Sequence, residues 1–194
     1  MTVCVGTIAA KSKAIVMVAD KALTYRAGGP AMQFDTGIRK ILPIGQSGWY
    51  VLVAGDPSFA GDVIEQAKSA LARDPTLRAS VAGMMNCMKE AYQKCRETAV
   101  VDHILSPNLL NKQLLVARPN KLLPLPDDHY DQVITDVQEY QAGTSLLVCG
   151  FDGDRKPQPH IFLLPIQAFT KITIYLGCIP SALAKTQPWR GYSW

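Results

Sequence analysis

Hydrophobic and polar positions in the first third of the chain follow patterns typical of β-strands. Residues 3–8 alternate between two faces, and the run Ala14–Ala19 is apolar at nearly every position, so we expect a central strand covered on both faces. Residues 39–44 and 49–54 flank Gly45-Gln46-Ser47-Gly48, which predicts a hairpin with a tight turn.

Two helical patterns follow these strands. Asp56-Pro57 is a strong start signal, because Asp is a good N-cap and Pro suits the first helical position. Asp74-Pro75 repeats the signal, and the second helix is expected to run to about Glu97. Apolar residues at helical spacing predict an antiparallel pair across one sheet face: Phe59, Val63, Ile64, Ala67 and Leu71 in the first helix, and Val81, Met84, Met88, Ala91 and Cys95 in the second.

The other segments are less regular. Residues 21–37 predict a loop or irregular hairpin, and residues 100–126, where prolines interrupt Leu-rich pieces, predict an insertion or long surface loop. A short helix capped by Asp127 and stopped by Gly143 is expected next.

The last part of the chain begins with a further hairpin signal. Leu146–Phe151 and His160–Leu164 flank an Asp-Gly-Asp turn, and residues 170–177 are one more candidate strand. After residue 165 the sequence has no second pair of helices with apolar stripes, so residues 166–194 form an atypical tail. A sheet face left uncovered exposes apolar area, so we expect the chain alone to be marginally stable and to bind a hydrophobic dye.

Composition limits the classes of function. A length of 194 residues and 48% apolar content are those of one globular domain, taken as residues 2–194. The net charge of +4 comes from scattered Lys and Arg, so nucleic acid is not expected as a partner. No apolar run is long enough for a membrane span, so no membrane partner is expected. Five irregularly spaced cysteines indicate reduced thiols in a cytoplasmic protein, and no metal or other cofactor is expected.

Candidate chemistry gathers at the ends of three apolar runs. Removal of Met1, which is usual before a small residue, would give Thr2 a hydroxyl and a free amine at the tip of a strand. An N-terminal amine can accept the hydroxyl proton of Thr and so activate it as a nucleophile. Asp20 closes the second run and Lys40 opens the third. If the runs pair as strands, these three residues meet at one end of a sheet.

Two further residues are candidates for the chemistry. Gly55 lies at a strand-to-helix turn, where a backbone N–H can stabilise a tetrahedral oxyanion. Cys4 is a rival nucleophile, although its position inside a strand is more typical of a small core residue.

Four short motifs occur together in one order. They are Thr2-x-x-x-Gly6, Ala19-Asp20 followed by Thr24, Lys40-Ile41, and the strand-to-helix junction Val51-Leu52-Val53-Ala54-Gly55-Asp56. In these motifs the chain resembles the N-terminal-nucleophile hydrolases, specifically the proteasome β-subunit branch. The resemblance covers residues 2–97 and returns at residues 146–152.

The resemblance implies a fold and an activity. The expected fold is of the α+β class, a four-layer αββα sandwich from which the C-terminal helical layer is missing. The expected reaction is cleavage of a peptide or amide bond through an acyl-enzyme on Thr2. Lys40 would be a buried ammonium that lowers the pKa of the nucleophile, with Asp20 as its charge partner, and Thr24 would bind an extended peptide.

The resemblance also implies self-association into stacked rings, hence a homo-oligomer. Methionines on the helix expected at 75–97 are the candidate contact surface. The sequence departs from the family at Ala22, where Arg is usual, and it offers no counterpart for the Ser and the further Asp that complete the usual site.

Two other functions remain open at this point. A catalytically inactive member of the same fold would act in assembly or binding, and a retained Met1 would favour it because it blocks the amine. A Cys-dependent amidohydrolase would use Cys4 instead.

Overall fold

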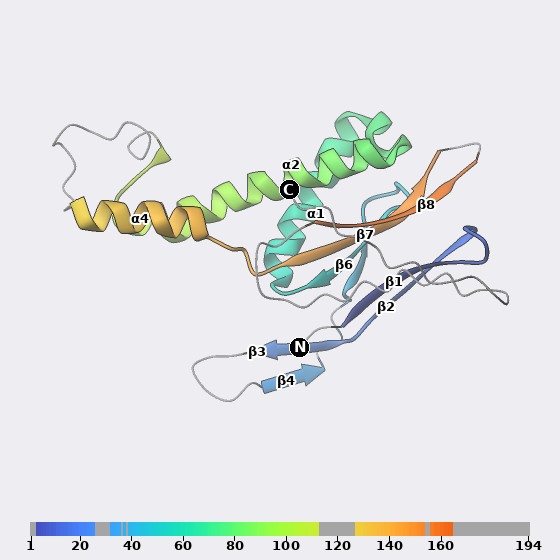
Figure 1. Ribbon diagram of the computed structural model, residues 1–194, viewed down its shortest axis with the longest axis horizontal. Helices are drawn as coiled ribbons and strands as arrows, with labels where there is room; N and C mark the ends of the chain where they lie inside the picture. Colours follow the sequence, from blue (N-terminus) through green and yellow to red (C-terminus); the bar gives the residue numbers. More distant parts are fainter. Residues whose placement is uncertain are drawn as a thin grey trace, which may run out of the picture.

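The computed structural model describes residues 3–25, 32–35, 37, 39–112, 127–153 and 156–164. Within these ranges the chain has mixed α and β structure, and all strand pairs are antiparallel. A four-stranded sheet lies between a pair of helices on one side and a two-stranded hairpin on the other (Figure 1).

The four-stranded sheet is the centre of the fold. Its strands, in spatial order, are β5 (Ile41–Pro43), β6 (Tyr50–Ala54), β7 (Ser145–Asp152) and β8 (Gln158–Leu164). The two hairpins predicted from the sequence are confirmed as β5–β6 and β7–β8. The ladder between β6 and β7 joins them and places Ala54 opposite Ser145.

Helices α1 (Pro57–Arg73) and α2 (Val81–Val100) cover one face of this sheet. Every residue of the predicted α1 stripe is buried, as are Met84, Met88 and Ala91 of α2, and they pack against Val51 and Val53 of β6 and Leu146 and Val148 of β7. The predicted cap of α1 is confirmed, because the Asp56 carboxylate accepts the N–H of Ser58 at 2.8 Å.

The start of the second helix differs from the prediction. Asp74-Pro75 begins a short 3₁₀ helix, η1 (Pro75–Ala79), and α2 begins after Ser80, whose hydroxyl accepts the Gly83 N–H at 3.0 Å. The expected contact surface of methionines is wrong for Met84 and Met88, which are fully buried. Their apolar side chains fill the space between α2 and the sheet.

Strands β1 (Cys4–Ala9) and β2 (Ala14–Ala19) form a hairpin that packs on the other face of the sheet. A Cβ at Gly6 would lie 3.1 Å from the Cys149 sulfur, so the two layers approach closely there. The prediction that Ala14–Ala19 is covered on both faces is wrong, because Val16 and Val18 are exposed. Strand β5 belongs to the facing sheet, so the first three apolar runs do not share one sheet.

Of the two alternatives expected at 21–37, a loop or an irregular hairpin, the structure has a hairpin. It consists of β3 (Ala22–Tyr25) and β4 (Met32–Asp35), and the Gly-Gly-Pro between them lies outside the described residues. Figure 1 shows this hairpin continuing from β2.

The segment predicted as a loop at 100–126 begins as helix. The helical path continues from α2 through a π-helix, η2 (Val101–Leu105), and a 3₁₀ turn, η3 (Ser106–Asn108). Helix α4 (Asp127–Glu139) packs beside it, with Val100, Leu105 and Leu110 buried against Val133. The loop prediction is therefore wrong for this part, because these apolar residues are the contact with α4.

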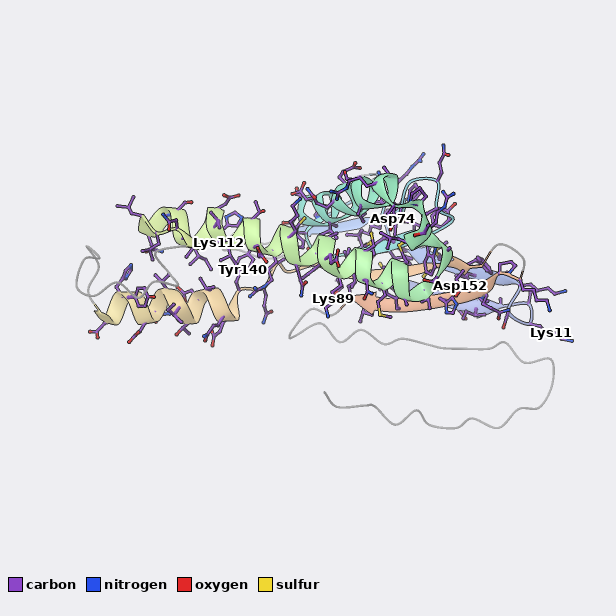
Figure 2. The ribbon with its side chains drawn as sticks, turned by 90° about the horizontal axis from the view of Figure 1, so that it is seen from above. Lys11, Asp74, Lys89, Lys112, Tyr140 and Asp152 are labelled. Atoms are coloured by element: carbon purple, nitrogen blue, oxygen red, sulfur yellow. The ribbon has the colours of Figure 1, made fainter. Side chains whose placement is uncertain are left out.

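These helical segments extend beyond the sheet layers as an arm, defined here as η2, η3, α4 and the end of α2 (Figure 2). Tyr140 lies at its base. The Arg96 guanidinium donates to the carbonyl oxygens of Val137 and Tyr140 at 3.0 and 3.3 Å, and so satisfies acceptors at the end of α4. Helix α4 ends at Glu139, so Gly143 is not the residue that stops it.

Several predictions concern residues outside the described ranges. They are the loop at 113–126, the candidate strand at 170–177 and the tail at 166–194. Within the described ranges the cysteines, Cys4, Cys87, Cys95 and Cys149, are free thiols. None of the described helices combines the length and the apolar character needed to cross a bilayer.

Candidate active site

Asp20 connects the end of β2 to the start of β1. Its N–H donates to the Val3 carbonyl oxygen at 3.1 Å, which extends the β1–β2 ladder by one residue pair. Its carboxylate accepts two hydrogen bonds: Oδ2 accepts the Val3 N–H at 3.1 Å, and Oδ1 accepts from Lys40 Nζ. Asp20 therefore fixes both the beginning of β1 and the Lys40 ammonium.

Lys40 reaches this point from the facing sheet. It directly precedes β5, and its carbonyl oxygen accepts the Val53 N–H at 2.9 Å. The side chain of Lys40 is 6% exposed and that of Asp20 is 27% exposed. A buried ammonium needs a charged, hydrogen-bonded partner. The predicted pairing of Lys40 with Asp20 is confirmed, although the two residues come from different layers.

The ion pair sets the charge of Asp20. Partial burial alone would raise the pKa of its carboxyl group. The hydrogen bonds from Lys40 and Val3 and the Lys40 charge outweigh burial and hold the pKa of Asp20 below its ordinary value. Asp20 is therefore a carboxylate at neutral pH, and the site is a true ion pair.

Thr2 and Thr24 are the predicted residues about which the structure says least. Thr2 lies outside the described residues, but in the sequence it immediately precedes Val3, whose N–H and carbonyl both bind Asp20. The backbone of Thr24 lies in β3, opposite Gln33. Its role in peptide binding stays a prediction.

Gly55 forms the turn from β6 into α1. Its φ is +107°, and a Cβ there would lie 1.9 Å from the Gly143 carbonyl oxygen, so only glycine fits. Gly55 comes two residues after Val53, whose N–H bonds to the Lys40 carbonyl oxygen. Two residues of a strand span about 7 Å. Gly55 is exposed, and its N–H has no hydrogen-bond acceptor within the described ranges. It lies at the end of β6, close to the point where Val53 bonds to Lys40.

Thr144 is a residue of this turn that sequence reasoning missed. Its side chain is fully buried, and its hydroxyl lies 3.1 Å from the Asp56 carbonyl oxygen and 3.2 Å from that of Ala142. A Thr before an apolar strand is unremarkable in sequence. Only the contact with Asp56, 88 positions away, shows that it holds the turn.

Cys4 is an unfavourable nucleophile in this structure. Burial raises the pKa of its thiol to about 11, against the opposing effect of the nearby Lys40 charge. The sulfur donates weakly to the Val53 carbonyl oxygen at 3.5 Å. Because the thiolate is the reactive form, Cys4 is protonated and unreactive at neutral pH.

A groove of about 340 Å³ borders the same turn at Asp56. Residues of α1, α2, η2 and the segment before β7 line it, among them Asp62, Asp102 and Tyr140, whereas Asp20 and Lys40 do not. The ion pair and this groove are therefore separate features of the surface.

Within the described ranges no group of His, Cys, Asp and Glu side chains is arranged to hold a metal ion. Comparison of the chain with models of protein families, with curated proteins and with solved structures finds no match.

Proposed function

We propose that this chain is an N-terminal threonine hydrolase, similar to proteasome β-subunits, that cleaves peptide or amide bonds. The observation that carries the proposal is the pair of the buried Lys40 with Asp20, whose carboxylate also binds the Val3 N–H at the start of β1. Thr2 is joined to Val3 by one peptide bond, which separates their Cα atoms by about 3.8 Å. A mature N-terminal Thr2 would therefore have its hydroxyl and amine beside the Lys40 charge.

In the proposed reaction, Thr2 Oγ attacks the carbonyl carbon while the Thr2 amine accepts the hydroxyl proton. The positive charge of Lys40 lowers the pKa of both groups, and the Gly55 N–H donates to the oxyanion. When the tetrahedral intermediate collapses, the C–N bond breaks and the leaving amine takes the proton. This leaves an ester on Thr2. Water then attacks the ester and gives one proton to the Thr2 amine. The bond between the acyl carbon and Oγ breaks, the amine returns the proton to Oγ, and the carboxylic acid and free Thr2 are released.

The arrangement of layers supports the same class. Helices α1 and α2, the four-stranded sheet and the β1–β2 hairpin match three consecutive layers of an αββα sandwich. In that architecture a second helical layer would cover the face that carries Val16 and Val18. The proposal includes self-association and a cytoplasmic location.

The test is covalent labelling of the full chain with a β-lactone, followed by intact mass and peptide mapping. We expect a mature N-terminus at Thr2 and one acyl group on it. Thr2→Ala should abolish labelling, and Cys4→Ala should leave it unchanged. Labelling that survives Thr2→Ala would refute the proposal. A retained Met1 with no adduct would instead support an inactive subunit of the same fold.

A further inference from the structure

The turn that carries Gly55 is anchored on both of its sides, by the first residue of β7 and by the residue just before it. On the strand side, Ala54 pairs with Ser145 in the β6–β7 ladder. On the helix side, the Asp56 carbonyl oxygen receives the Thr144 hydroxyl at 3.1 Å as well as the Ala60 N–H at 3.2 Å. Thr144 and Ser145, which are consecutive in the chain, thus hold the residues on the two sides of Gly55.

Gly143 restricts the turn from a third direction. Its carbonyl oxygen lies where a side chain of Gly55 would be, 1.9 Å from the Cβ position. Gly143 itself has φ +63°, which lets the chain bring this carbonyl over Gly55 before β7 begins. The Gly143 carbonyl therefore packs directly against the Gly55 backbone, where a side chain is excluded.

We propose that Thr144 is a positioning residue for the reaction: its hydroxyl fixes the Asp56 carbonyl and so keeps the Gly55 N–H aimed at the oxyanion. This inference rests on the proposed hydrolase function. A hydrogen-bond donor acts on an oxyanion only when it is held in place before the charge develops. Thr144 does not touch substrate and acts through the turn.

The proposed role of Thr144 depends on the hydrogen-bond donor of its buried hydroxyl. Its one proton is shared between two carbonyl acceptors, those of Asp56 and Ala142, and through the first of them it links the turn to the segment entering β7. Val has nearly the same shape but cannot donate, so Thr144→Val removes the link without a large change of volume. Ser keeps the donor and loses only a methyl group.

The experiment uses the β-lactone as the probe, because its attack by a hydroxyl also passes through an oxyanion. The loss of a complete oxyanion donor costs about 10²–10³-fold in rate, so a donor that is only displaced should cost about tenfold. We expect Thr144→Val to lower kinact about tenfold with KI changed less than about twofold, and Thr144→Ser to restore kinact. Thr135→Val makes the same substitution at an exposed hydroxyl that bonds to the Asp131 carbonyl within α4. It is the control for the substitution itself and should react as wild type.

A second measurement reads the turn without any chemistry. In ¹⁵N-labelled protein, the Gly55 amide resonance should shift or broaden in Thr144→Val, and it should keep its wild-type position in Thr144→Ser and Thr135→Val. A wild-type chain with no Thr2 adduct would refute the proposed hydrolase, while the Gly55 resonance would still report on the link. An unchanged Gly55 resonance in Thr144→Val, or a loss of kinact that Thr144→Ser does not restore, would overturn the role of Thr144.

Discussion

The two faces of the β1–β2 hairpin carry similar side chains in opposite environments. On the inner face, Cys4, Ile15 and Met17 pack against Leu52, Leu147 and Cys149 of the four-stranded sheet. On the outer face, Val16 and Val18 are 46% and 57% exposed. Both sets suit a β-strand, so residue type does not distinguish them. The two faces differ because the four-stranded sheet covers only the inner one. Substitutions on one face at a time can test this difference.

The largest effect is expected from removing a side chain between the two β layers. Leu147 is 6% exposed and faces the hairpin from the middle of β7. Leu147→Ala leaves a cavity there and should lower the free energy of unfolding by about 2–5 kcal/mol, measured in urea. Val18→Ala, on the outer face, is the control and should cost less than about 0.5 kcal/mol. Equal losses in the two variants would contradict the contrast between the faces.

The next effect concerns the ion pair where the two layers meet. Asp20→Ala leaves the Lys40 ammonium, 6% exposed, without its carboxylate, and should cost about 3 kcal/mol. Lys40→Ala leaves a carboxylate that is 27% exposed and partly hydrated, so it should cost only about 1 kcal/mol while abolishing β-lactone labelling. The control is Lys68→Ala, which breaks the exposed pair with Glu65. A larger loss in Lys40→Ala than in Asp20→Ala would show that this asymmetry is wrong.

The same pair predicts a smaller, pH-dependent effect. Because the folded pKa of Asp20 is below the ordinary value of 3.8, its contribution to stability is complete above that value. The contribution is lost as the pH falls from there through the lower folded pKa, because the unfolded chain takes up the proton first. Between pH 5 and pH 3, wild type should therefore lose more stability than Asp20→Asn. Parallel losses would mean that Asp20 titrates normally in the folded chain.

The smallest change in stability is expected on the outer face. Replacing Val16 and Val18 together with Thr keeps β-branched side chains and should change the free energy of unfolding by less than about 0.5 kcal/mol. Binding of a hydrophobic dye should fall, because the exposed apolar area is smaller. A destabilisation as large as that of Leu147→Ala would show that another part of the molecule covers this face in solution.

Local patterns in the sequence were sufficient for much of the fold. The Asp56 cap, the α1 stripe and the two sheet hairpins depend on residues close together in the chain, and the structure confirms them. The pairing of Asp20 with Lys40 also followed from the need of a buried charge for a partner. The cap, the stripe and the hairpins could be predicted because residues close together in the chain determine them. The Asp20–Lys40 pair joins two layers, and its burial was expected only from the resemblance.

The wrong predictions depended on distant residues. The run Ala14–Ala19 has the apolar pattern of a strand that is covered on both faces. The residues of the strand do not determine whether other segments form a layer over its second face. Val100 and Leu105 lie just before the Pro-containing part of the chain, and their burial depends on Val133 of α4. Thr144 has its role only because Asp56 is folded against it.

The helices between β6 and β7 also bear on how the sheet can form at all. Asp56 and Thr144 are 88 positions apart, and closing a flexible loop costs entropy that grows with the logarithm of its length. Helices form from near neighbours in the chain, and here α2 packs back on α1 while α4 packs back on the end of the helical path. If these helices form first, the flexible part of the loop is shorter, and bringing Ser145 to Ala54 costs less entropy. In a refolding experiment with pulsed hydrogen exchange, amides of α1 and α2 should therefore gain protection before those of the β6–β7 ladder, and the reverse order would contradict this pathway.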